Sequence, residues 1–366
     1  MGKKKNEPAQ AVPVKRKSRA GQIIIRIFSA LLGLVVGAFL YIYNMLGGFT
    51  FVDTPVVNEE DYSTIDLSEL EGSGDTTSSW AEGGHTRVYV DPAHPIIHVD
   101  QKDPDIENIL VFGVDSRGTD DIRCRSDAMI IVSINKADDT VKLISLMRDI
   151  GVYIGDTDES SSGSLDKLTH AYAYGGVGLM INTINRNFDL DIQRFVMLDF
   201  NSSANLIDLM GGVDIDVSPD EVRYANQTIA EQNEVTGSNA PFITSSGMQT
   251  LSGVQAIGWS RIRHLDSDFV RTSRQRVVAT ALINKMSSMD RLSQMAFLED
   301  SAGMFETNMR QLDLMRIGIN ALGGAGNMSE YRVPGDNMYS VQQDPWMMIL
   351  NWDVQLPELH SFIWGD

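Results

Sequence analysis

The longest hydrophobic stretch of the chain lies near its start. Residues 23–46 are almost entirely apolar and hold one charge, Arg26. About 20 consecutive apolar residues can cross a bilayer as a helix. Residues 1–22 are basic, and Lys and Arg accumulate on the cytoplasmic side of membrane spans. The pattern predicts a cytoplasmic tail, one transmembrane helix over 23–46 and an extracytoplasmic remainder. A cleaved signal peptide is disfavoured because no small-residue cleavage site follows.

The pattern of polar and apolar positions changes after the predicted span. Residues 47–104 are dominated by Asp, Glu, Ser, Thr and Gly, which indicates a stalk or accessory segment. Three apolar runs then predict strands over 108–114, 128–135 and 141–147. The short link at 136–140 predicts an antiparallel hairpin between the last two.

Strand and helix periods then alternate. They predict helices over 178–188 and 201–210, strands over 194–199 and 213–217, and a long polar loop over 219–245. Residues 259–263 alternate as a strand does, and helical periods cover 271–289. The alternation predicts an α/β fold, a layered α-β-α domain with a central mixed sheet, preceded by the single transmembrane helix. We place this domain at 105–290 and its continuation at 291–366.

Charge separates the tail from the rest of the chain. The whole protein carries −19, and residues 1–26 hold eight Lys or Arg and one Glu, which leaves −26 for the remainder. Such a surface disfavours nonspecific binding of nucleic acid. The single cysteine, Cys124, excludes an intramolecular disulfide.

A basic island interrupts this acidic remainder. Five arginines fall within residues 261–276. As an N-cap, Asp268 would begin a helix with Arg271, Arg274 and Gln275 on one face of its first turns. Cations oppose the dipole at a helix N-terminus, so their placement there indicates a bound anion such as phosphate. The alternative is a solvated arginine face with surface ion pairs to Asp266 and Asp268.

A second candidate site lies at the predicted strand ends. Asp115 and Asp127 bracket a loop that also holds Arg117 and Arg125, and Arg148 follows the third strand. Two carboxylates beside a phosphate suit Mg²⁺, although Asp–Asp at this spacing is weak evidence by itself. Together with the basic island, these residues are typical of a pyrophosphate clamp. The common nucleotide-binding, serine-hydrolase and zinc-protease motifs are absent from the sequence.

Six motifs occur in one order: GVDSR at 113–117, RSD at 125–127, MRD at 147–149, KLTHAY at 167–172, RIRH at 261–264 and DFVRTSRQ at 268–275. This series resembles the LytR–CpsA–Psr family of Gram-positive cell envelopes over roughly residues 105–290. Four positions depart from the family pattern. Met147 stands where proline is usual, Thr169 where asparagine is usual, Val270 where glycine is usual, and Gly258 with Trp259 replaces Ala-Tyr. The departures bear on substrate identity more than on the reaction class.

The resemblance implies a Mg²⁺-dependent phosphotransferase of the cell membrane. Such proteins move a glycopolymer, for example teichoic acid or capsule, from a polyprenyl-pyrophosphate carrier onto peptidoglycan through a phosphodiester. By motif, Asp115 and Asp127 hold the metal. The residues implied to bind pyrophosphate are Arg117, Arg125, Arg148, Arg261, Arg263, Arg271 and Gln275. The residues implied to take part in catalysis are Asp115, Asp127, Arg148, Asp149, Arg263 and Asp268. Asp149 and Asp268 would orient arginines, and either is a candidate base.

Two other functions use the same residues. With water as acceptor the site would be a pyrophosphate hydrolase, and without turnover the protein would be an envelope regulator or binding protein. A polyprenyl chain also requires an apolar groove, which helices around 178–188, 201–210 and 277–286 could line. The alternative is that their apolar residues are ordinary core.

Overall fold

The computed structural model describes residues 50–62, 88–114, 124–155, 163–301 and 303–365. The predicted tail and transmembrane helix, together with Asp115 and Arg117, lie outside these ranges. Among the described residues, no helix has both the length and the apolar character that a membrane span requires.

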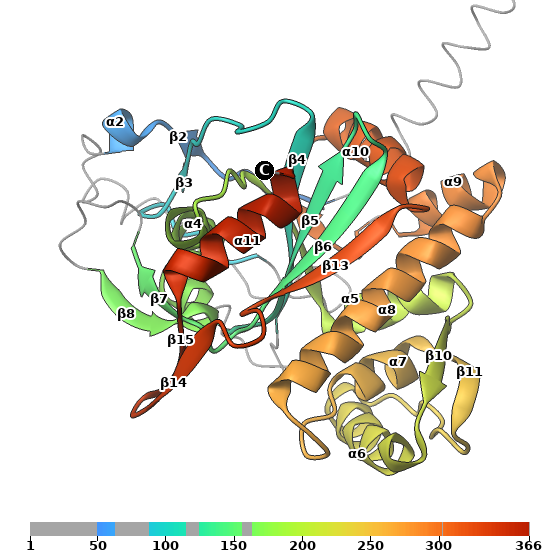
Figure 1. Ribbon diagram of the computed structural model, residues 1–366. Coiled ribbons are helices and arrows are strands. Elements are labelled where there is room, and N and C mark those ends of the chain that lie inside the picture. The colour runs from blue at the N-terminus through green and yellow to red at the C-terminus, as the bar shows by residue number, and fades with distance from the viewer. Residues whose placement is uncertain (1–49, 63–87, 115–123, 156–162, 302, 366) are drawn as a thin grey trace, which may run out of the picture. The chain divides into compact units, whose positions relative to one another are not determined.

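A seven-stranded mixed sheet forms the centre of the fold (Figure 1). The predicted hairpin is confirmed, because β5 (Ser126–Asn135) pairs antiparallel with β6 (Thr140–Leu146). β4 (Ile106–Val114) is antiparallel to β5 and parallel to β9 (Arg194–Asp199). On the outer side of β6, β13 (Met328–Val333) pairs in parallel, so the chain after residue 290 supplies a strand of this sheet. The other edge holds β12 (Glu306–Thr307) and β1 (Thr50–Phe51).

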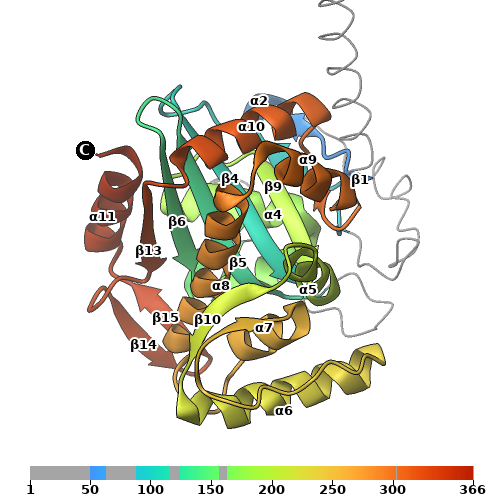
Figure 2. The same cartoon turned by 90° about the vertical axis from the view of Figure 1, so that its right-hand side faces the viewer.

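Helices cover both faces of this sheet, as the two perpendicular views show (Figures 1 and 2). Met129 and Ile131 of β5 are buried in a core with α4 (Leu168–Phe188) and α11 (Trp352–Trp364). The intervening Ile130 and Val132 point to the opposite face, as a strand requires. There they pack in a core with side chains of α8 (Asp268–Ser288) and α10 (Gln311–Gly324). The predicted α/β layers with a central mixed sheet are therefore confirmed.

A second hydrophobic core lies beside the sheet (lower right in Figure 1). It is formed by α5 (Phe200–Leu209), α6 (Pro219–Thr236), α7 (Gly253–Ser260) and the antiparallel pair of β10 (Val213–Val217) with β11 (Gly247–Leu251). One side of α8 closes this core through Val278 and Ala281. The strand predicted at 213–217 thus exists, but it belongs to this small sheet.

The predicted polar loop over 219–245 is wrong for its first two thirds, because residues 219–236 form α6. Ser218 and Glu221 form a reciprocal capping box, and Pro219 occupies the first turn, where its missing N–H costs nothing. Val222, Ala225 and Ile229 follow at helical spacing and contact the second core. The helix has few other apolar residues, so the helical period of its hydrophobic positions is weak. The capping box at its start is the stronger sequence signal for this helix.

The extended segment predicted at 259–263 is also wrong. Ser252 and Gln255 form a capping box that begins α7, and Arg261 is the C-cap of this helix. Trp259 is buried on the last turn of α7, and Ile262 is buried just after the C-cap, where its N–H donates to the carbonyl oxygen of Trp259 at 3.3 Å. Arg261 and Arg263 consequently lie in the turn between α7 and α8.

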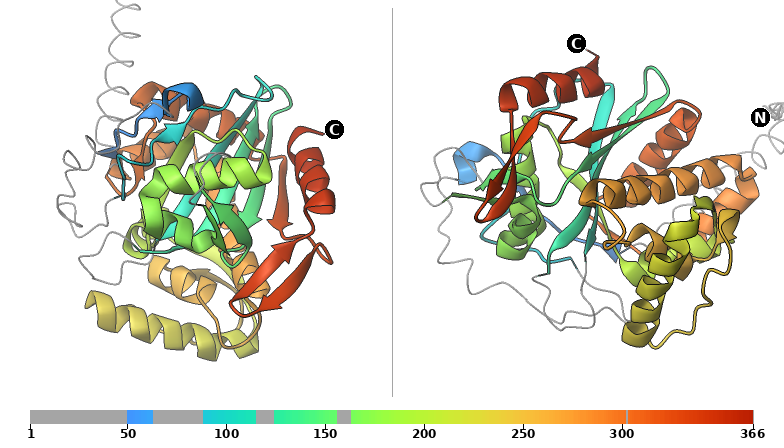
Figure 3. Two further views of the ribbon diagram at one scale, coloured as in Figure 1. Left: turned by 90° about the vertical axis from the view of Figure 1, so that its left-hand side faces the viewer. Right: turned by 60° about the horizontal axis from the view of Figure 1, so that its bottom comes forward.

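The remaining elements are short or lie at the periphery. A hairpin of β14 (Tyr339–Gln343) and β15 (Trp346–Leu350) extends beside the pair of β7 (Gly151–Ile154) and β8 (Ser164–Lys167), as two further views show (Figure 3). The others are β2 (Val56–Val57), α2 (Glu59–Tyr62), β3 (Ile96–Ile97) and α9 (Arg291–Asp300).

Candidate active site

The predicted site residues meet at one edge of the central sheet because of strand direction. Met129 near the start of β5 lies opposite Leu146 at the end of β6. Asp127 and Arg148, each two residues further out, therefore come together. The ends of β4 and β9 reach the same edge, since Val114 lies opposite both Ser126 and Asp199. Asp115 follows Val114 directly in the chain but lies outside the described residues.

Asp127 joins two arginines from different elements. Its Oδ1 accepts a hydrogen bond from Nη1 of Arg148 at 2.9 Å, and its Oδ2 accepts one from Nη2 of Arg263, also at 2.9 Å. Burial alone would raise the pKa of Asp127, but the charges of Arg148, Arg263 and Arg271 outweigh it and hold this pKa below its ordinary value. Asp127 is thus an ionised carboxylate between guanidinium groups.

The start of α8 completes the cluster. Nη2 of Arg271 lies 2.9 Å from Oδ1 of Asp268, and Nη2 of Arg148 lies 3.9 Å from the same oxygen. Asp268 is the first helical residue and Ser267 is the N-cap, so the predicted capping role of Asp268 is wrong. Its carboxylate instead faces the arginines, as the sequence analysis also expected.

Arg271 is the most deeply buried cation of the cluster, with its side chain 3% exposed. Burial lowers its pKa, and the nearby charges of Arg148 and Arg263 lower it further. Within the described part of the chain, the buried Nε of Arg271 has no hydrogen-bond partner, whereas Nε of Arg148 has an ion-pair contact of 3.3 Å with Oδ2 of Asp149. Buried donors are normally satisfied, so the N–H group of Arg271 could donate to an oxygen of a bound anion.

Lys167 is a neighbour of this cluster that was not predicted as a site residue. Its Nζ lies 2.9 Å from Oδ1 of Asp149, whose Oδ2 lies 3.3 Å from Nε of Arg148. The lysine begins one of the six motifs, so its position in the sequence carried a signal. Nothing in the sequence showed that β8 would bring it to the end of β6.

Other predicted residues lie around this centre. Arg125 is exposed beside β5, Gln275 is half-buried on α8, and the guanidinium of Arg261 lies 4.3 Å from the ring centroid of Phe200. Arg274 does not share the role of Arg271. It is buried against Glu221 and Asp266, with its Nε 2.7 Å from Oε1 of Glu221. It therefore fastens α8 to α6.

Two departures from the family pattern have clear structural positions. The hydroxyl of Thr169 donates a hydrogen bond of 2.9 Å to the carbonyl oxygen of Ser126, which ties the start of α4 to the start of β5. Met147 is buried in the main core directly before Arg148. Both residues support the backbone that carries Asp127 and Arg148.

Comparison with known protein families identifies the family of this chain. The sequence model of the LytR_cpsA_psr family matches residues 76–352, which is most of the chain. The chain belongs to this family. The resemblance inferred from the six motifs is therefore confirmed.

Several named proteins are similar in sequence to this chain over part of their length. The polyisoprenyl-teichoic acid–peptidoglycan teichoic acid transferase TagT of Bacillus subtilis is 30% identical over 199 residues, 54% of this chain and 58% of that protein. TagU of Halalkalibacterium halodurans is 28% identical over 232 residues, 63% of this chain and 69% of that protein. The structure described as TagT bound to LI-WTA has a TM-score of 0.57 and 25% identity, and it covers 76% of this chain and 98% of that one.

The site of this family member offers part of a Mg²⁺ ligand set. Mg²⁺ binds to one or two protein carboxylates together with phosphate oxygens and waters. Asp127 is ionised and fits this chemistry, although each of its oxygens already accepts a guanidinium hydrogen bond. Among the residues that the structure covers, no three His, Cys, Asp or Glu side chains cluster as a metal site. A metal here would therefore need oxygens from a bound ligand or from the undescribed Asp115.

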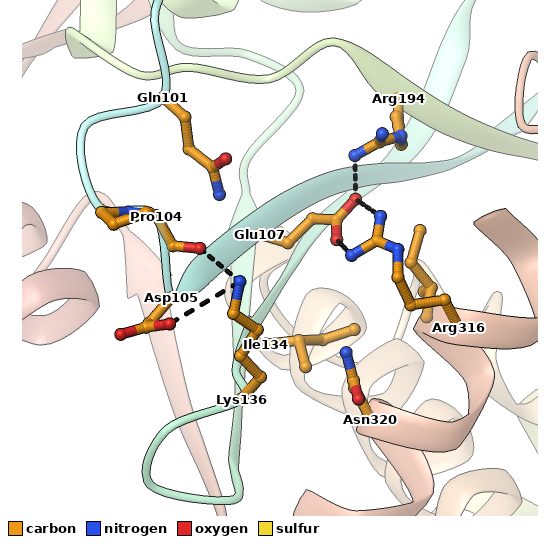
Figure 4. A pocket seen from close by; sticks show the side chains of 10 residues that line it. Gln101, Pro104, Asp105, Glu107, Ile134, Lys136, Arg194, Arg316 and Asn320 are labelled. Atoms are coloured by element: carbon orange, nitrogen blue, oxygen red, sulfur yellow. Dashed lines mark hydrogen bonds and ion pairs between the residues drawn. The ribbon is translucent and has the colours of Figure 1, made fainter.

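A polar pocket exists at the opposite end of the sheet (Figure 4). It lies where β4 begins and β5 ends, since Ile106 pairs with Asn135. The carboxylate of Glu107 pairs there with Arg194 and Arg316, the latter through a 2.8 Å contact from Nη1. Glu107 and the two arginines thus pair with one another, and the pocket is separate from the cluster around Asp127.

Proposed function

We propose that this protein transfers a glycopolymer from a polyprenyl-pyrophosphate carrier to peptidoglycan and forms a phosphodiester. The names of its relatives describe teichoic acid transfer to peptidoglycan. The observation that carries the proposal is the buried Arg271, which shares Asp268 with Arg148, lies near enough to Arg263 for its charge to lower the pKa of Arg271, and has an unsatisfied Nε. Three guanidinium groups at one point suit a diphosphate better than any neutral ligand.

Catalysis would rest mainly on neutralising charge. Arg148, Arg263 and Arg271 would bind the pyrophosphate, with Arg117, Arg125, Arg261 and Gln275 around them. Asp115 and Asp127 would hold Mg²⁺, which supplies further stabilisation of negative charge on phosphate oxygens when it is bound. Stabilising charge that develops on the transferring group is the main contribution of proteins to phosphoryl transfer.

The bond changes follow from this placement. A sugar hydroxyl of peptidoglycan attacks the phosphorus nearer the glycopolymer, and the new O–P bond forms as the bridging P–O bond breaks. Polyprenyl phosphate leaves with the bond electrons. The hydroxyl proton passes to a carboxylate. Asp149 and Asp268 are the candidates, because both lie beside the arginines that would bind the reacting pyrophosphate. No covalent enzyme intermediate is required.

The carrier lipid needs an apolar surface near the arginines. Ile130 and Val132 of β5 and Val196 of β9 are only half-buried on the sheet face beneath α8 and α10, and both strands reach the edge that carries Asp127. This face suits an isoprenoid chain. The helix predicted at 178–188 does not contribute to it, because α4 packs in the main core on the opposite face. We also propose that residues 23–46 anchor the protein in the cell membrane, with residues 1–22 in the cytoplasm.

The test uses the full-length chain in detergent with a polyprenyl-pyrophosphate-linked oligosaccharide and peptidoglycan fragments. We expect joined product with Mg²⁺, little with EDTA, and a loss of about a hundredfold or more in Asp127→Ala and Arg263→Ala. Arg316→Ala is the matched control, because this arginine lies at the far end of the sheet.

Product analysis separates the other functions. Release of oligosaccharide phosphate without joining would indicate a hydrolase. Tight binding of the lipid with no turnover under any condition would indicate a binding protein. Equal activity in Arg263→Ala and wild type would refute the proposed site.

A further inference from the structure

The hairpin of β14 and β15 presents one large aromatic side chain beside the site. Trp346, the first residue of β15, remains 42% exposed. The next two residues, Met347 and Met348, are each 1% exposed and anchor the strand. An exposed tryptophan on a firmly anchored strand is the kind of surface that binds a ligand.

The hairpin is fixed to the strand end that carries Arg148 and Asp149. The backbone N–H of Met348 donates a 3.0 Å hydrogen bond to the carbonyl oxygen of Asp149, and Met348 also forms a parallel bridge with Ile150. Gly151 packs so closely here that a Cβ atom would lie 2.8 Å from Cδ1 of Ile349. The position of Trp346 is therefore set relative to the arginine cluster.

The other strand of the hairpin reaches the start of α8. The rings of Tyr339 and Phe269 are 5.6 Å apart, and Phe269 follows Asp268 in the chain. The hairpin thus contacts both elements that supply the charged cluster, the end of β6 and the start of α8. It is a wall of the site and not a separate appendage.

A single lysine connects Trp346 to the charged groups. Nζ of Lys167 lies 5.4 Å from the centroid of the Trp346 ring and 2.9 Å from Oδ1 of Asp149. An aromatic surface next to an ammonium and a carboxylate matches the chemistry of a pyranose, which has an apolar face of C–H groups and a rim of hydroxyls.

We propose that Trp346 is a stacking platform for a sugar ring, with the ammonium of Lys167 available to its hydroxyls and Asp149 holding that ammonium in place. The proposal rests on the transferase function above and adds a subsite to it. The ring belongs either to the donor glycopolymer or to the peptidoglycan acceptor. The chemistry of the platform is the same for both, and kinetics distinguish them.

The test compares Trp346→Ala and Trp346→Phe with Val341→Ala in the full-length chain. Val341 lies on the same hairpin and is also 42% exposed, so it controls for general effects of a hairpin substitution. Each substrate is varied while the other is saturating. We expect Trp346→Ala to raise KM for one substrate about tenfold with kcat within about twofold, and Trp346→Phe to retain most of the affinity. The substrate whose KM rises is the one that stacks.

Unchanged KM values for both substrates in Trp346→Ala would overturn the proposal. Equal losses in Trp346→Phe and Trp346→Ala, with a lowered Tm in both, would assign Trp346 a structural role and also overturn it. If the wild-type protein does not join the substrates, the transferase function fails but the platform is still tested. The soluble oligosaccharide of the donor and a β-1,4-linked N-acetylglucosamine tetrasaccharide are then each added, and one of them should change tryptophan emission in the wild type and not in Trp346→Phe. No change in the wild type with either sugar would contradict the platform.

Discussion

The ionisation of Asp127 links the site to stability at low pH. The surrounding arginines hold its pKa below the ordinary value of 3.8. A carboxyl with a lowered folded-state pKa stabilises the fold above its unfolded pKa, and this contribution is lost as the pH falls through the folded pKa. We expect the Tm of the wild type to decrease below about pH 4 more steeply than that of Asp127→Asn, measured by thermal unfolding from pH 6 to 2. Parallel curves would show that Asp127 is not held by these arginines.

Tyr331 provides the corresponding prediction at high pH. Its hydroxyl donates to Glu358 at 3.0 Å, and burial together with this carboxylate raises the pKa of Tyr331 to about 12. A raised folded-state pKa stabilises the fold below the unfolded pKa of 10, and this contribution is lost as the pH rises towards 12. Thermal unfolding of Tyr331→Phe should show less dependence on pH across this interval. Tyr339→Phe, whose ring packs on Phe269, should retain the wild-type dependence.

At the scale of elements, two helical glycines have opposite roles. A Cβ on Gly178 of α4 would lie 1.8 Å from the backbone oxygen of His94, whereas a Cβ on Gly318 of α10 would have no neighbour within 4 Å. We expect Gly178→Ala to cost about 2–3 kcal/mol through overpacking and Gly318→Ala to stabilise by about 0.5–1 kcal/mol through helix propensity. Chemical denaturation of both variants measures the two changes in the free energy of unfolding. A stable Gly178→Ala would mean that α4 does not pack so closely on residues 94–95.

Some elements and site residues could be predicted from the sequence, and others could not. Strong apolar runs identified β4, β5, β6 and β9, because buried strands carry their own hydrophobic signal. The helix α6 was missed because its residues are mostly polar and its identity depends on the Ser218–Glu221 cap. The six motifs identified Asp127, Arg148, Arg263 and Arg271, which the structure brings together. They could not show that Arg274 turns towards Glu221 or that Trp346 lies beside Lys167, since both contacts depend on tertiary packing across long separations.

At the scale of the whole molecule, the arginines of the site are carried by elements that pack in two different hydrophobic cores. Arg148 extends from the central sheet, whereas Arg261 and Arg263 follow α7 in the second core. A ligand that binds both groups stabilises the second core against local opening. We therefore expect a polyprenyl-pyrophosphate analogue to slow amide hydrogen exchange in β10 and β11 more than in β4 and β5. Arg263→Ala should abolish this protection, and protection confined to the central sheet would contradict the coupling.

The pairing of the arginines with Asp127, Asp149 and Asp268 also has a consequence for the proposed turnover. These carboxylates are tethered to the site, so any incoming anion competes with partners that are always present at high local concentration. A pyrophosphate, which presents several charged oxygens at once, can displace them where a monoester phosphate offers fewer contacts. In the proposed transfer the lipid would keep only one phosphate, and the aspartates could pair with the arginines again. The lipid product would then leave readily, and free inorganic phosphate would be a poor inhibitor.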